Sequence, residues 1–105
     1  MKKINLIIKE GEILIKENNV YELEIIYKQI LEEENNFDLG YLFQKLFLKA
    51  CIYGNKETIL WFINIYNNMD FISKSAYKHT LNYAKYLIKK RRDNELYKWY
   101  IKICS

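Results

Sequence analysis

Two five-residue segments of the chain are nearly the same, WFINI at residues 61–65 and WYIKI at residues 99–103. In both cases a glutamate stands four residues before the tryptophan, Glu57 in the first and Glu95 in the second. A match of this kind indicates one structural unit that is used more than once. Coincidence in an isoleucine-rich sequence is the alternative.

Further markers extend the repeat to a third unit. Glu22 stands four residues before Ile26, which opens the segment IYKQI, and NNFD at residues 35–38 returns as NNMD at residues 67–70. The spacing of these markers is in the mid-thirties. Such a period indicates stacked helical hairpins, in which no hairpin buries its apolar face alone.

The composition favours helices over strands. The 105 residues contain no proline and three glycines, whereas all-β folds depend on many turns built from these two residues. Half of the residues are hydrophobic, which is enough for one packed core. The sequence therefore predicts an all-α single domain, residues 1–105, with repeat-like units at about 1–36, 37–69 and 70–105.

Apolar residues recur with a period near 3.6 in six segments, which predicts six helices. The first five cover residues 3–17, 20–34, 39–53, 56–66 and 73–90, and the sixth follows Asp93. Asp38, Asn55 and Asp93 are predicted N-caps, and a left-handed Gly54 is expected to end the third helix. Residues predicted to face the core include Ile7, Leu31, Phe47, Phe62, Ala76, Tyr100 and Ile103.

One stretch of the chain resembles the helical part of an ankyrin repeat. It reads KACIYGNKETILWFINIYNNMDF at residues 49–71. Ala50 and Cys51 match the pair of small residues of that family, Gly54 the turn glycine and Glu57 the acidic residue. Small residues let two helices approach closely, and glycine turns the chain between them.

The resemblance departs from the family in two places. Residues 45–48 read KLFL where the family has Thr-Pro-Leu-His, and the third unit has KKRRDN in place of the glycine turn. The resemblance implies an ankyrin-like α-solenoid of three stacked helical hairpins, with reduced or absent β-hairpin fingers. The codon bias behind so many Ile, Lys, Asn and Tyr residues is similar to that of ankyrin-like proteins of large DNA viruses, which would place the chain in the host cytoplasm.

The resemblance also implies a non-catalytic protein-binding function. In arrays of this type the odd-numbered helices line a concave face, and their non-core positions select the partner. The matching positions, and thus the candidate partner-binding residues, are Lys49, Ile52, Tyr53, Tyr83 and Tyr86.

No pattern in the sequence indicates catalysis, a cofactor or a metal site. His79 is the single histidine, the glycines stand alone rather than in a phosphate-binding loop, and Cys51 and Cys104 lack metal-ligand spacing. The acidic run at residues 32–34 is typical of a solvated helix end. We therefore expect no enzyme activity and no metal.

A basic cluster offers a different interpretation. Its members are Lys85, Lys89, Lys90, Arg91 and Arg92, in a chain of formal net charge +4. Tyrosines 83, 86 and 97 lie among them, a mixture that suits phosphates and stacked bases. A solvated junction between two helices and an acidic protein partner are the other two explanations.

The apolar runs and the cysteines indicate where the protein is located and whether it self-associates. The first predicted helix is apolar nearly all round, so self-association through it is a further hypothesis. Its apolar run stops at Lys9, too early for a signal peptide, and the longest uncharged run, residues 58–69, is too short to span a bilayer. Two cysteines without redox spacing are typical of a reducing compartment. The sequence thus predicts a cytoplasmic protein without membrane contact.

Overall fold

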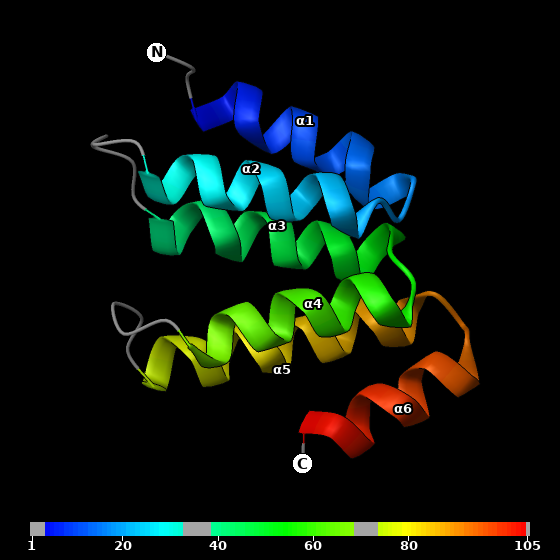
Figure 1. Ribbon diagram of the computed structural model, residues 1–105. Coiled ribbons are helices and arrows are strands. Elements are labelled where there is room, and N and C mark those ends of the chain that lie inside the picture. The colour runs from blue at the N-terminus through cyan, green and yellow to red at the C-terminus, as the bar shows by residue number, and fades with distance from the viewer. Residues whose placement is uncertain (1–3, 33–38, 69–73, 105) are drawn as a thin grey trace.

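The described part of the chain consists of α-helices. The computed structural model describes residues 4–32, 39–68 and 74–104, and within them it has six α-helices and no strand (Figure 1). The helices are α1 (Ile4–Lys16), α2 (Val20–Glu32), α3 (Leu39–Tyr53), α4 (Lys56–Asn67), α5 (Lys74–Lys90) and α6 (Asn94–Cys104). The all-α prediction is confirmed, and the helix bounds agree closely with the predicted ones. The predicted cap Asp38 and the segments where β-hairpin fingers would lie fall outside the described residues.

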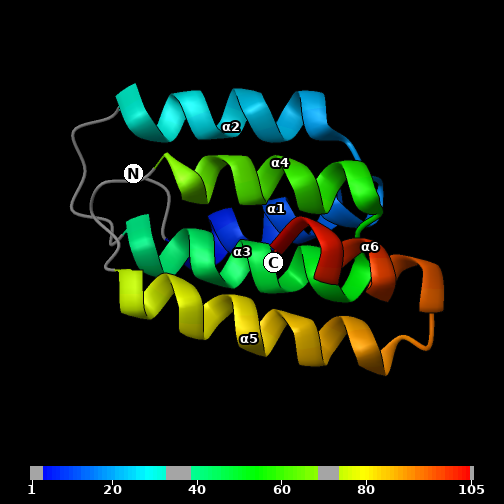
Figure 2. The same ribbon diagram turned by 90° about the horizontal axis from the view of Figure 1, so that it is seen from below.

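Consecutive helices pair, and successive pairs lie next to one another. α1 contacts α2, α3 contacts α4, and α5 contacts α6, while α3 also contacts α1 on one side and α5 on the other. Figure 1 shows the pairs following one another down the molecule in chain order. Seen from below in Figure 2, α2 and α4 lie on one side and α3 and α5 on the other. The helices α1, α3 and α5 thus form a continuous row.

The core is centred on α3. This helix buries six residues, more than any other described helix, because it packs against α1, α4 and α5 at once. Gly11 lets α1 approach it closely, since a Cβ atom there would lie 2.5 Å from Cδ2 of Leu46. Three residues predicted to face the core, Leu31, Ala76 and Ile103, are instead exposed. Each lies at the edge of its apolar stripe, where the period alone does not decide burial.

The three even-numbered helices begin in the same way. The side-chain oxygens of Asn19, Asn55 and Asp93 accept hydrogen bonds from the backbone nitrogens three residues later, at 3.1, 3.0 and 3.1 Å. This confirms the predicted caps Asn55 and Asp93 and adds Asn19. Measured from these caps, Glu22 is displaced by one position relative to its two repeat counterparts. An alignment of the three units on their glutamates therefore differs by one residue, in the first unit, from an alignment on their N-caps.

Left-handed residues end two of the helices, but Gly54 is not one of them. No described glycine has a positive φ, whereas Asn18 and Arg92 have φ values of 54° and 59°. Gly54 is required for space instead, because a Cβ atom there would lie 2.8 Å from the backbone oxygen of Ala50. The prediction of a left-handed Gly54 is therefore wrong. The left-handed conformation occurs instead just after α1 and α5, at Asn18 and Arg92. α1 ends in a Schellman motif, in which the backbone N–H of Asn19 donates to the backbone oxygen of Leu14 at 2.9 Å.

Candidate interaction surface

The turns of the three helix pairs are bonded to one another. Oδ1 of Asn18 accepts from the backbone nitrogen of Asn55 at 2.8 Å and from the hydroxyl of Thr58 at 3.0 Å. From the other side, Nη1 of Arg91 donates to the backbone oxygens of Cys51 at 3.1 Å and Gly54 at 2.8 Å. The carbonyls at the end of α3, which have no partner within the helix, are satisfied in this way. These bonds fix α1, α3 and α5 relative to one another.

Trp61 connects two of the even-numbered helices. Its Nε1 donates to Oε2 of Glu24 at 2.6 Å, and its ring meets the ring of Tyr27 edge-on with centroids 6.1 Å apart. Both partners lie on α2, so the tryptophan packs between the first and second helix pairs. Trp99 is half-buried against the core. These contacts make Trp61 a packing residue between two helix pairs.

More than half of the exposed large apolar and aromatic side chains within the described residues lie on the odd-numbered helices. Of the eleven such side chains that are exposed within the described residues, seven lie on α1, α3 and α5. We call these seven the odd-helix surface: Leu6, Ile13, Tyr41, Ile52, Tyr53, Tyr83 and Tyr86. Exposed apolar side chains on neighbouring helices are candidates for contact with another molecule.

Two of the predicted residues are held by side chains of α1. Nζ of Lys49 lies 3.0 Å from Oε1 of Glu12, and the hydrogen bond from Lys49 lowers the pKa of the Glu12 carboxyl. Nζ of Lys16 lies 4.6 Å from the centre of the Tyr53 ring. Both pairs join α1 to α3. Lys49 and Tyr53 are therefore placed by neighbouring side chains rather than extended freely into solvent.

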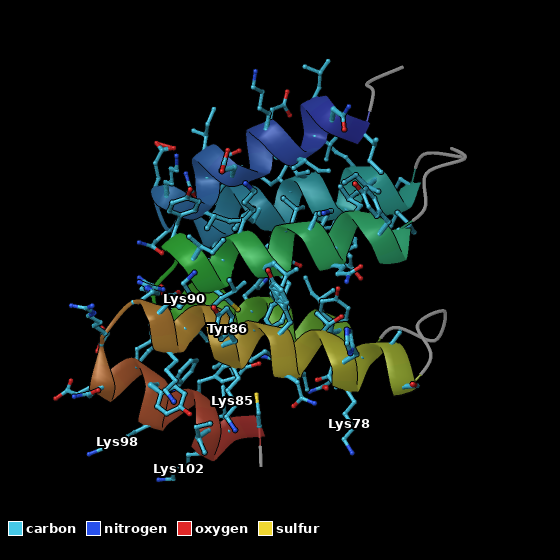
Figure 3. The ribbon with its side chains drawn as sticks, turned by 180° about the vertical axis from the view of Figure 1, so that it is seen from behind. Lys78, Lys85, Tyr86, Lys90, Lys98 and Lys102 are labelled. Atoms are coloured by element: carbon cyan, nitrogen blue, oxygen red, sulfur yellow. The ribbon has the colours of Figure 1, made fainter. Side chains whose placement is uncertain are left out.

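The predicted residues of α5 form an aromatic pair. The ring centroids of Tyr83 and Tyr86 are 6.4 Å apart, and Nζ of Lys90 lies 5.3 Å from the centre of the Tyr86 ring. Figure 3 shows Tyr86 and Lys90 on the part of α5 that faces α3. Ile52 is exposed near the end of α3, the helix that packs beside α5. The structure thus places Ile52, Tyr83 and Tyr86 on two adjacent helices.

Charge is distributed unevenly between the helices. Neither α3 nor α5 contains an aspartate or glutamate, although together they carry seven lysines. The acidic residues within the described helices lie on α1, α2, α4 and α6. An acidic group that approached the exposed side chains of α3 and α5 would therefore meet lysines and no carboxylate of these two helices.

The predicted basic cluster is only partly a surface. Lys85, Lys89, Lys90 and Arg92 are exposed, whereas Arg91 is half-buried and bonded to the end of α3. Lys85 and Lys90 leave α5 on different sides (Figure 3). The structure therefore separates the cluster into residues that face the solvent and one that joins two helix pairs. No signal in the sequence distinguishes Arg91 from Arg92, because the partner carbonyls are far away in the chain.

The potentially reactive groups are distributed singly. Cys51 is buried, and burial raises the pKa of its thiol; burial also raises the pKa of the Cys104 thiol. His79 is exposed on α5. Within residues 4–32, 39–68 and 74–104, no three His, Cys, Asp or Glu side chains are grouped as metal ligands would be. None of the described helices has both the length and the apolar character needed to cross a membrane.

Comparisons of the chain with known proteins found no matching family model, no similar curated protein and no similar solved structure.

Proposed function

We propose that this protein is a non-catalytic protein-binding module, built as an ankyrin-like stack of three helical hairpins. The contacts between successive helix pairs support the stack, because each turn is bonded to the next across 37 or 40 residues of chain. The small residues Gly11, Ala50 and Ala84 are buried on the three odd-numbered helices, which suits close packing along the row.

The odd-helix surface carries this proposal. Its seven exposed side chains lie on one row of helices, and two of those helices carry no acidic residue. Tyrosine is a residue that interfaces favour, since it combines a large contact area with a polar hydroxyl. We assign the partner contact to Ile52, Tyr83 and Tyr86, with Lys49 and Tyr53 at the border with α1.

The proposal is tested by affinity capture from nuclease-treated lysate of the cells in which the protein occurs. The bait is the full chain, and its variant is Tyr83→Ala combined with Tyr86→Ala. The matched control is Tyr21→Ala combined with Leu60→Ala, which removes two exposed side chains from even-numbered helices. We expect one discrete protein with the wild type and the control but not with the variant. Equal capture by all three baits would contradict the assignment.

Nucleic-acid binding is the second candidate. It is favoured by lysines placed over tyrosine rings, at 5.3 Å for Lys90 on Tyr86 and 6.0 Å for Lys89 on Tyr97. Such pairs suit phosphates and stacked bases. Binding of an oligonucleotide that weakens steeply with salt, and that Lys89→Ala with Lys90→Ala reduces, would support it.

Self-association through α1 is the third candidate. Most of the apolar residues of α1 face the core, but Leu6 and Ile13 are 53% and 58% exposed. If these side chains form an interface between two copies, Leu6→Lys with Ile13→Lys would make the protein monomeric in sedimentation. A mass that stays monomeric over a wide range of wild-type concentration would exclude this candidate.

A further inference from the structure

A groove runs between α5 and α6 on the side of α5 away from Tyr86 and Lys90. In Figure 3, Lys78 and Lys85 extend from α5 toward the side of α6. The groove has a volume of about 260 Å³. Exposed polar side chains lie at its rim and half-buried apolar ones at its floor: Lys78, Asn82 and Lys85 above Leu81, Ile101 and Cys104.

The volume of the groove limits what it can hold. Pockets for drug-sized ligands and cofactors have volumes of roughly 300–1,000 Å³, and this groove is smaller. It therefore fits a single side chain or a small group. The floor favours an apolar side chain, because moving apolar surface out of water is favourable.

The rim adds a requirement for negative charge. Lys78 and Lys85 are separated by about two helical turns, or about 10 Å along the axis. Within the described residues neither makes an ion pair, and α5 contains no carboxylate. Asn82 lies between them and can both donate and accept hydrogen bonds. Carboxylates on either side of an apolar anchor would meet the two lysines.

We propose that this groove binds an acidic segment of a partner protein, with an apolar side chain on the floor and flanking carboxylates on Lys78 and Lys85. The inference rests on the proposed protein-binding function and names the chemistry of the partner. A nucleic acid fits the groove less well. The one aromatic ring in it, that of Tyr100, is 1% exposed, and its hydroxyl donates to the backbone oxygen of Leu81 at 2.9 Å, so no ring face is open to a base.

The experiment measures fluorescence polarisation of short labelled probes against the full chain. The first probe is a glutamate-rich peptide with one central leucine, the second has alanine at that position, and the third is an oligothymidine. The variant is Lys78→Glu with Lys85→Glu. The control is Lys28→Glu with Lys98→Glu, which changes the net charge equally at two exposed lysines outside the groove. Circular dichroism melts verify that both variants are folded.

We expect the leucine peptide to bind best, and its affinity to fall about tenfold in the groove variant but less than about threefold in the control. Equal losses in both variants, equal binding of the alanine peptide, or tighter binding of the oligothymidine through Lys78 and Lys85 would overturn the inference. Absence of peptide binding would do so as well.

The outcome is separable from that of the capture experiment. A chain that captures a protein through Tyr83 and Tyr86 but binds neither peptide keeps the proposed function and loses the groove inference. A chain that captures no protein loses the proposed function, whatever the peptides show.

Discussion

Oδ1 of Asn18 lies 2.8 Å from the backbone nitrogen of Asn55, so a side chain in the first turn bonds to the cap of the second. The same oxygen accepts from the hydroxyl of Thr58, which is fully buried. Asn18 reaches both groups from a left-handed backbone conformation, with φ of 54°. Asparagine tolerates this conformation better than most residues do. One residue therefore ends α1 and attaches the first helix pair to the second.

Replacing Asn18 should destabilise the protein. Asn18→Ala leaves the buried Thr58 hydroxyl without its partner and places alanine in a left-handed conformation, so we expect a loss of about 2–4 kcal/mol. Asn18→Gly removes the same hydrogen bonds, but glycine adopts the left-handed conformation without strain, so we expect a smaller loss of about 1–2 kcal/mol. Urea unfolding followed by circular dichroism measures both. Equal stability of alanine variant and wild type would show that the bonds contribute nothing.

Neighbouring arginines should behave in opposite ways. Arg91→Ala removes two charge-assisted hydrogen bonds to the end of α3, and we expect a loss of about 2 kcal/mol in the free energy of unfolding. Arg92 is exposed and has φ of 59°, so Arg92→Gly should stabilise the protein by about 1 kcal/mol. The two midpoints in urea decide the comparison. The interpretation is wrong if Arg92 is the more important residue for stability.

Two buried tyrosines provide a matched pair. The hydroxyl of Tyr100 donates to Leu81, whereas that of Tyr66 is buried without a hydrogen-bond partner within the described residues. We therefore expect Tyr100→Phe to cost about 1 kcal/mol and Tyr66→Phe to be neutral or stabilising by up to about 1 kcal/mol. Thermal unfolding of the two variants measures the difference. A larger loss for Tyr66→Phe would indicate a partner for its hydroxyl.

Alkaline pH should destabilise the protein. Burial raises the pKa of Cys51 above its ordinary value of 9.0 and the pKa values of Tyr66 and Tyr100 above 10.0. The folded state then holds protons that the unfolded state releases, so the stability is complete below pH 9 and falls as the pH rises beyond it. Urea midpoints at pH 8, 9.5 and 10.5 test this. Midpoints that stay constant or rise would contradict the burial of these groups.

Local patterns in the sequence predicted most of the fold. The 3.6 period located the helices, and the caps Asn55 and Asp93 followed from side chains that compete for backbone N–H groups. Asn19 has the same signal, with Glu22 three residues later, so the sequence contains this third cap as well. The repeat aligns the first unit with the others on their glutamates. These side chains are exposed, so packing does not hold them at the same position relative to the N-cap in each unit.

The contacts between residues far apart in the chain could not be predicted from local sequence patterns. Asn18 looks like any turn residue until Asn55 and Thr58 are placed beside it, and Arg91 looks like its neighbour until the end of α3 is in reach. Gly54 was expected to be left-handed because glycine permits it, whereas the close approach of the Ala50 carbonyl is what excludes a side chain there. For the interaction surface, the sequence indicated individual positions. Which of them lie on adjacent helices depended on how α3 and α5 pack.

The most direct test of the odd-helix surface is hydrogen–deuterium exchange of the chain with and without the captured partner. The proposed function predicts that the partner slows exchange in Leu39–Tyr53 and Lys74–Lys90, because it covers α3 and α5. Val20–Glu32 and Lys56–Asn67 should exchange as before, apart from a small overall stabilisation. Protection confined to α2 and α4 would contradict the account and move the binding surface to the other side of the molecule.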